Sequence, residues 1–522
     1  MVAFKLIKIA RLTVTLCLLS YLSIQTVLAS SWQDEPEARE QLHQIGLELA
    51  LAEVHPQLTQ WWQQATSESS ASDAADDRLL LGIQSFWRYW QQLSFEDRQH
   101  LKTKRANLSA NETDQEYLRL VGEQQARSEL LASLAPSYAN YPELRQQLAR
   151  LLELKQQPWP ALRTATVRPG ERLPVIASIR ERLELLGDLP KPQKVSASYS
   201  LLDRISSSEE IIASGDELQQ SAFSSPEETD VFEPQLYDKE LEVAVRRFQQ
   251  RHGLTVDGVV GPQTYAWLDV SPLRRSQLLM RSQLRTLIGD TLPDSYLLVN
   301  IPEYHMRLYQ DDVIVLESNV IVGRDQRKTP VMSSEITHVV FNPPWNVPRS
   351  IINRDIVPKL YRDPGYIDRM GFEVLDGERV VPNYEWLMRL EEGGGFPYRL
   401  RQRPGRSNSL GAFKFHLPTT NAIYLHDTPA RSLFSRDSRA FSSGCVRVEG
   451  AEQLAQWLLK DQLSNTSFNA FKNNPKTRWV KVVPPLPLRM VYWASWLGED
   501  GLPQYRNDIY DFEPQLNDPF TG

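Results

Sequence analysis

Two side chains in the C-terminal third of the chain could together perform nucleophilic chemistry: the thiol of Cys445 and the imidazole of His426. A cysteine attacks as its thiolate, so it needs a base to take the proton and N–H donors to stabilise the resulting oxyanion. The residues before the cysteine, Ser442-Ser443-Gly444, are small and turn-forming, which would expose backbone N–H groups near the sulfur. This short stretch therefore offers a nucleophile, a base and candidate oxyanion donors.

The residues after the cysteine favour a reactive thiol. A lone buried cysteine is most often an inert apolar residue, which is the simpler interpretation. Arg447 follows two residues later, however, and the pattern Ala451, Leu454 and Leu458 predicts a helix starting nearby. A fixed cation and a helix start both lower a thiol pKa, so we expect a lowered pKa for Cys445.

Other chemistries fit this stretch less well. A zinc site normally needs a second cysteine or a His-x-x-x-His pair, and the sequence has neither near Cys445. We therefore expect no metal and no cofactor. Ser442 or Ser443 could be a nucleophile, but no Gly-x-Ser-x-Gly elbow accompanies them.

The chain has 522 residues, which suggests about three domains. Residues 1–29 combine Lys5, Lys8 and Arg11 with a short apolar stretch and end in Val-Leu-Ala, as a secretory signal peptide does. The net charge of −7 would fall to −10 on its removal, which argues against nucleic acid as a partner. We expect an exported protein that is soluble outside the cytoplasmic membrane and meets that membrane only through an uncleaved signal peptide. Its only other cysteine, Cys17, would leave with that peptide.

The elements before the cysteine predict two helical parts. Residues 30–165 repeat apolar residues at helical spacing and indicate a helical scaffold domain. Residues 166–270 contain helical segments at Pro174 to Leu186 and after Leu241, separated by a Ser- and Glu-rich insert at 191–233 that we expect to be a mobile loop. The run Phe248-Gln249…Gly253-Leu254…Asp257-Gly258…Gly261…Thr264 resembles a small three-helix peptidoglycan-binding domain. Glycan binding and a spacer role both stay open for it.

Residues 271–522 begin with a helical connector and then alternate as β-strands do from about Leu297. Within them, residues 355–406 break the strand rhythm and contain Gly393-Gly394-Gly395 and an arginine cluster. We expect this insertion to be a lid over the site; a solvated basic loop is the alternative.

The ordered set His426-Asp427-Thr428 with Ser442-x-Gly444-Cys445-Val446-Arg447 closely resembles the active-site signature of the YkuD-type L,D-transpeptidases. The resemblance runs from about Tyr296 to Asp511 and includes Thr329-Pro330 and Asn342-Pro…Trp345-Asn-Val-Pro348. Together with the helical parts it is similar to the large YcbB-like periplasmic members. Ser443 departs from the pattern, because many members have His there. The fold class implied is multidomain α+β: a helical N-terminal region, a three-helix peptidoglycan-binding domain and a mainly-β catalytic domain with an inserted lid.

The resemblance implies a reaction and a set of roles. Cys445 would attack a tetrapeptide stem of peptidoglycan at its third residue, release D-alanine and pass the acyl group from a thioester to a second stem, forming a 3→3 crosslink. His426 would be the base, the Asp427 backbone would orient it, and the N–H groups of Gly444 and Cys445 would form the oxyanion hole. The expected substrate-binding residues are Arg447, Tyr424, Trp345, Ser442 and Ser443, and a carbapenem would acylate the same thiol.

Two further functions stay open. An L,D-carboxypeptidase or amidase would hydrolyse the same acyl-enzyme, and the sequence does not separate it from a transpeptidase. A non-catalytic wall-binding scaffold would not need His426 and Cys445. The acceptor, the oligomeric state and any protein partner are not indicated by the sequence.

Overall fold

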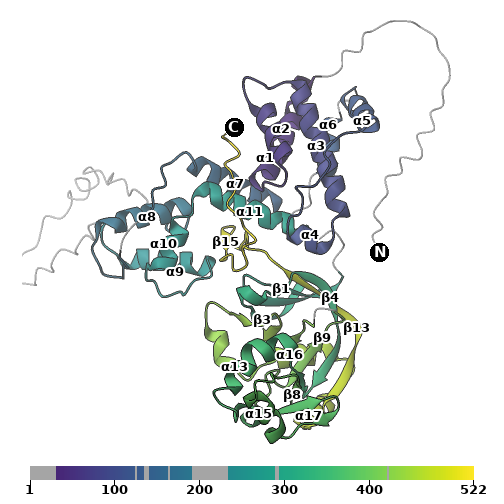
Figure 1. Cartoon of the computed structure of the whole chain (residues 1–522). Coiled ribbons are helices and arrows are strands. Elements are labelled where there is room, and N and C mark those ends of the chain that lie inside the picture. Colours follow the sequence, from purple (N-terminus) through teal and green to yellow (C-terminus); the bar gives the residue numbers. More distant parts are fainter. Residues whose placement is uncertain are drawn as a thin grey trace, which may run out of the picture.

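The structure is a computed structural model that describes residues 31–123, 126–134, 140–162, 165–190, 233–287, 293–419 and 422–521. The expected signal peptide, Cys17 and all but the last residue of the 191–233 insert lie outside these ranges. Within them, no helix combines the length and apolar character needed to cross a membrane. The described chain forms a helical part, a three-helix part and a β-rich part, as Figure 1 shows, so the expected multidomain α+β class is confirmed.

The helical part contains the elements that the 3.6-residue apolar repeat predicts. Its helices are η1 (Trp32–Asp34), α1 (Pro36–Leu51), α2 (Pro56–Thr66), α3 (Asp73–Gln92), α4 (Phe95–Gln99), α5 (Glu112–Glu123), α6 (Arg127–Leu134) and α7 (Tyr141–Leu154). The long helix α3 starts where the Ser72 hydroxyl accepts a hydrogen bond from the Ala75 N–H, at 3.2 Å. Trp62, Trp87 and Trp90 are buried in the shared core.

The three-helix part consists of α8 (Pro174–Leu186), α9 (Lys239–Arg251) and α10 (Pro262–Leu268). Helix α8 has the predicted bounds and ends at Gly187 in the left-handed conformation, at φ +87°. Asp238 caps α9 by accepting from the Leu241 N–H at 2.8 Å. Ile176, Leu183 and Phe248 form the centre of its core.

The β-rich part is a mixed sheet that closes on itself. Its strands are β1 (Ser295–Asn300), β2 (His305–Gln310), β3 (Val313–Gly323), β4 (Met332–Phe341), β9 (Phe413–His416), β10 (Leu425–His426), β11 (Ala440–Ser442), β12 (Val446–Val448) and β13 (Arg478–Val491). Their order is β11-β3-β12-β10-β9-β4-β13-β1-β2, and β2 also pairs with β3. The short helices η2 (Asp325–Arg327), η4 (Arg431–Ser435), α16 (Ala451–Leu459) and α17 (Asn465–Asn473) connect the strands. Closure leaves few free strand edges.

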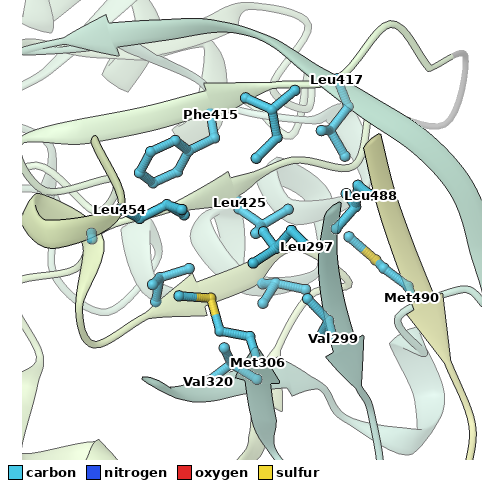
Figure 2. Close-up of a cluster of buried hydrophobic side chains, with 14 of the residues drawn as sticks. Leu297, Val299, Met306, Val320, Phe415, Leu417, Leu425, Leu454, Leu488 and Met490 are labelled. Carbon is cyan, nitrogen blue, oxygen red and sulfur yellow. The ribbon is translucent and has the colours of Figure 1, made fainter. Parts of the chain in front are cut away.

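The core of this sheet lies on one face of alternating residues. Figure 2 shows Leu297 and Val299 of β1, Phe415 of β9 and Leu425 of β10 meeting Leu454 of α16. Helix α16 is the helix predicted just after the cysteine, and it covers this face. The opposite side chains of the same strands are therefore free to build a polar site.

The insertion is a unit of its own, built from a second, smaller sheet and several short helices. It contains β5 (Trp345–Asn346), α12 (Arg349–Ile351), η3 (Ile352–Ile356), α13 (Val357–Leu360), α14 (Tyr366–Arg369), β6 (Phe372–Asp376), β7 (Arg379–Val380), α15 (Asn383–Glu391) and β8 (Arg399–Gln402), with strand order β5-β8-β6-β7. Ile352, Trp386 and Leu400 belong to a hydrophobic core of its own. The alternative of a solvated basic loop is therefore wrong. This capping unit also begins at Trp345, earlier than the expected start at 355.

Helix α11 (Pro272–Thr286) joins all three parts, and Figure 1 shows it between the helical part and the sheet. Its Leu279, Met280 and Leu284 pack in the helical core, so this helical connector lies outside the catalytic sheet. Figure 1 also shows that the chain's C-terminal end returns to the helical part. There, after β14 (Ser495–Leu497) and β15 (Pro503–Tyr505), the carboxylate of Glu513 forms buried ion pairs with Arg281 and Arg285 of α11.

Candidate active site

The strand register places three polar residues side by side. His426 on β10 lies opposite Arg447 on β12 and opposite Lys414 on β9. Their neighbours Leu425, Val446 and Phe415 point to the other face, into the core. The sheet therefore presents an imidazole between two cations.

Cys445 immediately precedes β12, at the end of the Ser442-Ser443-Gly444 turn. Its Sγ lies 3.7 Å from the carbonyl oxygen of Ala422, to which the thiol donates. The side chain and backbone N–H of Tyr424 also interact with the sulfur, and the Tyr424 ring lies 5.7 Å from the His426 ring. The structure thus gathers Cys445, Tyr424, His426 and Arg447 in one place. In this arrangement the thiol donates its hydrogen bond to the Ala422 carbonyl and not to the imidazole of His426.

The imidazole of His426 is held in one tautomer. Its Nδ1 lies 2.5 Å from the carbonyl oxygen of Asp427. A carbonyl only accepts, so Nδ1 must carry the proton, and Nε2 keeps its lone pair. His426 is 5 % exposed, and so its free nitrogen is available only to groups within the site.

Asp427 is itself anchored through its side chain. One carboxylate oxygen accepts from the Ala412 N–H at 2.8 Å, and the other accepts from Arg431 at 2.5 Å. Gly411 leaves room for this carboxylate, because a Cβ there would lie 2.3 Å from it. The Ala412 and Arg431 bonds hold the Asp427 side chain, and they therefore also fix the Asp427 carbonyl that orients His426.

Burial dominates the acid–base properties of the pair. It raises the pKa of the Cys445 thiol above its usual range, although Tyr424, Lys414 and Arg447 act in the opposite direction. The expected lowered pKa is therefore wrong. Burial and the positive charge of Arg447 lower the pKa of His426 to about 3. Near neutral pH, thiol and imidazole are both uncharged, and the proton must move during the attack.

The turn before the cysteine is fixed by its own hydroxyls and by Thr329. The Ser442 hydroxyl donates to the Cys445 carbonyl at 2.5 Å and accepts from the Gly444 N–H at 3.1 Å. The Thr329 hydroxyl donates to the Gly444 carbonyl and accepts from the Gly323 N–H, both at 2.8 Å. Gly444 adopts φ +114°, a conformation that favours glycine.

These bonds change which groups can bind an oxyanion. The Gly444 N–H already has an acceptor within the turn, so it is not free as the sequence suggested. The Cys445 N–H has no hydrogen-bond acceptor among the described residues. The geometry therefore favours Cys445 over Gly444 as a donor.

Ser443 connects the turn to the capping unit. Its hydroxyl accepts from Arg327 at 2.8 Å, and Arg327 also forms a salt bridge with Asp355 in η3. Arg324 lies farther away, at 3.5 Å from the same hydroxyl. Sequence reasoning singled out neither Arg327 nor Asp355, since charged residues at turns are usually solvated.

The expected substrate-binding residues have different surroundings. Tyr424 has a raised pKa because of burial and the nearby thiol, and it receives a hydrogen bond from Trp345 of the capping unit. The Nε of Arg447 is buried and has no hydrogen-bond partner in the described part of the chain. Lys414 was missed: its Nζ lies 4.0 Å from the Tyr424 ring centroid, and burial lowers its pKa. The alternation in Phe-Lys-Phe-His could have indicated that it faces away from the core.

A buried thiol and an oriented neutral imidazole, with the cations of Lys414 and Arg447 near them, form an arrangement that can support nucleophilic acyl transfer. Residues 294–481 match the family model described as the L,D-transpeptidase catalytic domain (YkuD). Residues 207–268 match the model described as "Putative peptidoglycan binding domain". The chain thus carries a YkuD-family L,D-transpeptidase catalytic domain together with a peptidoglycan-binding domain.

Individual relatives carry the same names. A Haemophilus influenzae protein named "Putative L,D-transpeptidase" is 42 % identical over 229 residues, which are 43 % of this chain and 46 % of that protein. The matched part thus spans about half the length of this curated relative. A solved L,D-transpeptidase from Xylanimonas cellulosilytica is 12 % identical and aligns with 63 % of this chain and 98 % of its own, at a TM-score of 0.19. One from Mycobacterium smegmatis is 12 % identical over 38 % of this chain and 58 % of its own, at a TM-score of 0.18.

Proposed function

We propose that this protein is a periplasmic cysteine L,D-transpeptidase that forms 3→3 crosslinks in peptidoglycan through a thioester on Cys445. One observation carries the proposal: within the matched catalytic domain, Cys445 and His426 both lie beside Tyr424, and among the described residues the Nε2 of His426 has no hydrogen-bond partner. The signal peptide expected at residues 1–29 supports export to the periplasm.

The acylation step follows from the neutral pair. The thiol turns from the Ala422 carbonyl toward His426, Nε2 takes its proton, and the sulfur bonds to the carbonyl carbon of the third stem residue. The Cys445 N–H stabilises the oxyanion of the tetrahedral intermediate. As the intermediate collapses, the imidazolium returns the proton to the leaving amine of D-alanine, and a thioester remains.

The second step reverses these roles. An amine on the side chain of a neighbouring stem attacks the thioester, and its proton passes to Nε2. The C–S bond breaks, the new amide forms the crosslink, and the proton returns to the sulfur. Water in place of the amine would give a tripeptide, the product of the hydrolase alternative.

The surrounding residues bind and shield the substrate in this mechanism. The buried Nε of Arg447 lacks a partner, which suits a guanidinium that receives a substrate carboxylate. Trp345 brings the capping unit to Tyr424 beside the thiol, which supports a lid role for that unit. Ser442 and Ser443 act through the turn and the capping unit, not by touching substrate.

The test is Cys445→Ala in the full chain, incubated with disaccharide-tetrapeptides and analysed by mass spectrometry. We expect crosslinked dimers from the unchanged protein and none from Cys445→Ala, which should also resist acylation by a carbapenem. Thr337→Ser, which keeps the hydroxyl and lies on β4, three positions from β12 in the sheet order, serves as the control. Dimers from Cys445→Ala would refute the mechanism, and tripeptides alone from the unchanged protein would favour the hydrolase.

A further inference from the structure

A large cavity lies between the three-helix part and the catalytic sheet, and the chemistry at Cys445 does not use it. Its volume is about 930 Å³, which is at the upper end of the range for ligand sites. Thr255 and Gln263, from the stretch matched to the peptidoglycan-binding model, line one side. Tyr304, Arg436 and Phe441 of the catalytic domain line the other, so both domains contribute to one site.

Contacts between the two parts maintain the cavity. The Thr255 hydroxyl bonds to the carboxylate of Asp437, and the Trp267 indole donates to Asn507 at 2.9 Å. Gly253 allows Arg506 to approach, since a Cβ at that glycine would lie 2.6 Å from the Arg506 Cδ. The walls are thus held in place by side chains from both domains.

The charges in the cavity are largely satisfied. Arg307 pairs with Glu303 at 2.6 Å. Arg439 donates to the carbonyl of Tyr304 at 3.0 Å, and Arg506 donates to that of Arg251 at 3.0 Å. A polyanion would require several free cations here. The walls instead suit an uncharged ligand with many hydroxyl and amide groups.

Two side chains of the cavity wall, Arg436 and Phe441, are available to contact a ligand. Among the described residues, the Arg436 guanidinium has no hydrogen-bond or ion-pair partner, and it lies 5.9 Å from the Phe441 ring centroid. The Phe441 ring is 38 % exposed. An exposed ring can pack against the C–H face of a sugar, and the adjacent guanidinium can donate to its hydroxyl and N-acetyl oxygens.

The position of Phe441 connects this cavity to the nucleophile. Phe441 lies on β11 directly before Ser442 and four residues before Cys445, so the two Cα atoms are at most roughly 14 Å apart. Three extended stem residues span about 10 Å. A sugar beside Phe441 could therefore present the third residue of its own stem to the thiol.

We propose that this cavity binds the glycan backbone of peptidoglycan, a chain of N-acetylated amino sugars, and that the attached stem runs along β11 to Cys445. The stem-delivery part rests on the proposed function. Glycan binding itself does not, because it needs no turnover.

The experiment titrates the full chain carrying Cys445→Ala with oligomers of N-acetylglucosamine, an uncharged chain of N-acetylated amino sugars without stems, and measures affinity by calorimetry. Adding Arg436→Ala or Phe441→Ala should weaken binding at least tenfold. Adding Gln263→Ala should weaken it severalfold. The matched control is Arg478→Ala, since Arg478 is also exposed and lies 4.5 Å from a phenyl ring, that of Phe471, but does not line the cavity. It should change affinity less than twofold.

Equal affinities in all variants, with folding verified by circular dichroism, would overturn the proposal. So would a titration in which the free tetrapeptide, and not the glycan, depends on Arg436, because the cavity would then be a peptide site. Failure of the protein with Cys445 intact to form crosslinks, together with normal glycan binding, would instead count against the proposed function alone, so the two failures are distinguishable.

Discussion

Replacing Thr329 with valine should remove the side-chain link that holds Gly444 of the cysteine turn to the end of β3. The Thr329 hydroxyl is the only link between the Gly323 N–H and the Gly444 carbonyl among the hydrogen bonds of the described residues, each at 2.8 Å. Valine has nearly the same shape but no hydroxyl. Because Thr329 is 1 % exposed, water cannot readily replace it.

The magnitude follows from the two groups left without partners. An unsatisfied buried donor or acceptor costs about 1–3 kcal/mol, so the variant should lose roughly 3 kcal/mol of unfolding free energy. For a folded unit of the size of the catalytic domain (residues 294–481), this loss of unfolding free energy corresponds to a Tm decrease of about 6–12 °C. Thr329→Ser keeps the hydroxyl and loses one methyl group, about 1 kcal/mol.

The assay combines thermal unfolding with the rate of acylation of Cys445 by a carbapenem. Since the Gly444–Cys445 backbone would shift, Thr329→Val should acylate at least tenfold more slowly, whereas Thr329→Ser should stay within about threefold of the unchanged protein. Equal Tm values and equal rates for the valine and serine variants would show that the turn does not depend on this hydroxyl.

Two further predictions concern His426 and Arg327. Because the pKa of His426 is about 3 in the native state and near 6.5 when unfolded, the unfolded chain binds the extra proton between these values, and stability should fall as the pH drops through them. Between pH 7 and pH 4.5 this amounts to about 2–3 kcal/mol, and urea unfolding should show a smaller drop for His426→Gln; equal drops would contradict a neutral buried imidazole. Arg327→Ala removes the link between Ser443 and Asp355 and should reduce kcat/KM on disaccharide-tetrapeptides about tenfold. Arg324→Ala, whose contacts are longer, should have a much smaller effect, and equal effects would argue against a specific link.

The local elements were predictable because local physics determines them. The apolar spacing of Pro174 to Leu186 and the glycine after it specify α8 and its end. The alternation after Leu297 specifies β-strands, and the helix predicted at Ala451 is α16. In each case, residues within a few positions carry the whole signal.

The electrostatics of the site were not predictable in this way. The cation two residues after Cys445 suggested a lowered thiol pKa, but the desolvation that raises it comes from strands distant in sequence. Lys414 enters the site only through the register between β9 and β10. Similarly, the Gly444 N–H was a reasonable oxyanion donor until the Ser442 hydroxyl was seen to accept from it.

The ordered sheet of the capping unit was not predictable from the sequence for a related reason. Its arginines left a solvated loop open as the alternative to a lid, yet Arg401 pairs with Glu373 across two of its strands at 2.8 Å. Trp345, a landmark of the catalytic domain in the sequence, pairs with the last strand of the unit at Gln402. Pairing between residues so far apart along the chain leaves no local pattern.

Helix α11 has a mechanical consequence. Arg275 bonds to His252 in the three-helix part at 2.8 Å, Ser282 accepts from Ser495 beyond the sheet at 3.0 Å, and Arg281 reaches the Ala52 carbonyl of the helical part at 2.9 Å. Such buried links oppose the hinge motion that separate domains usually have. If the proposed glycan site and the proposed role of Cys445 both hold, a glycan strand bound beside the three-helix part would stay at a fixed distance from the thiol. Under the proposed function, the protein would then join only stems that reach this one position relative to the strand it binds.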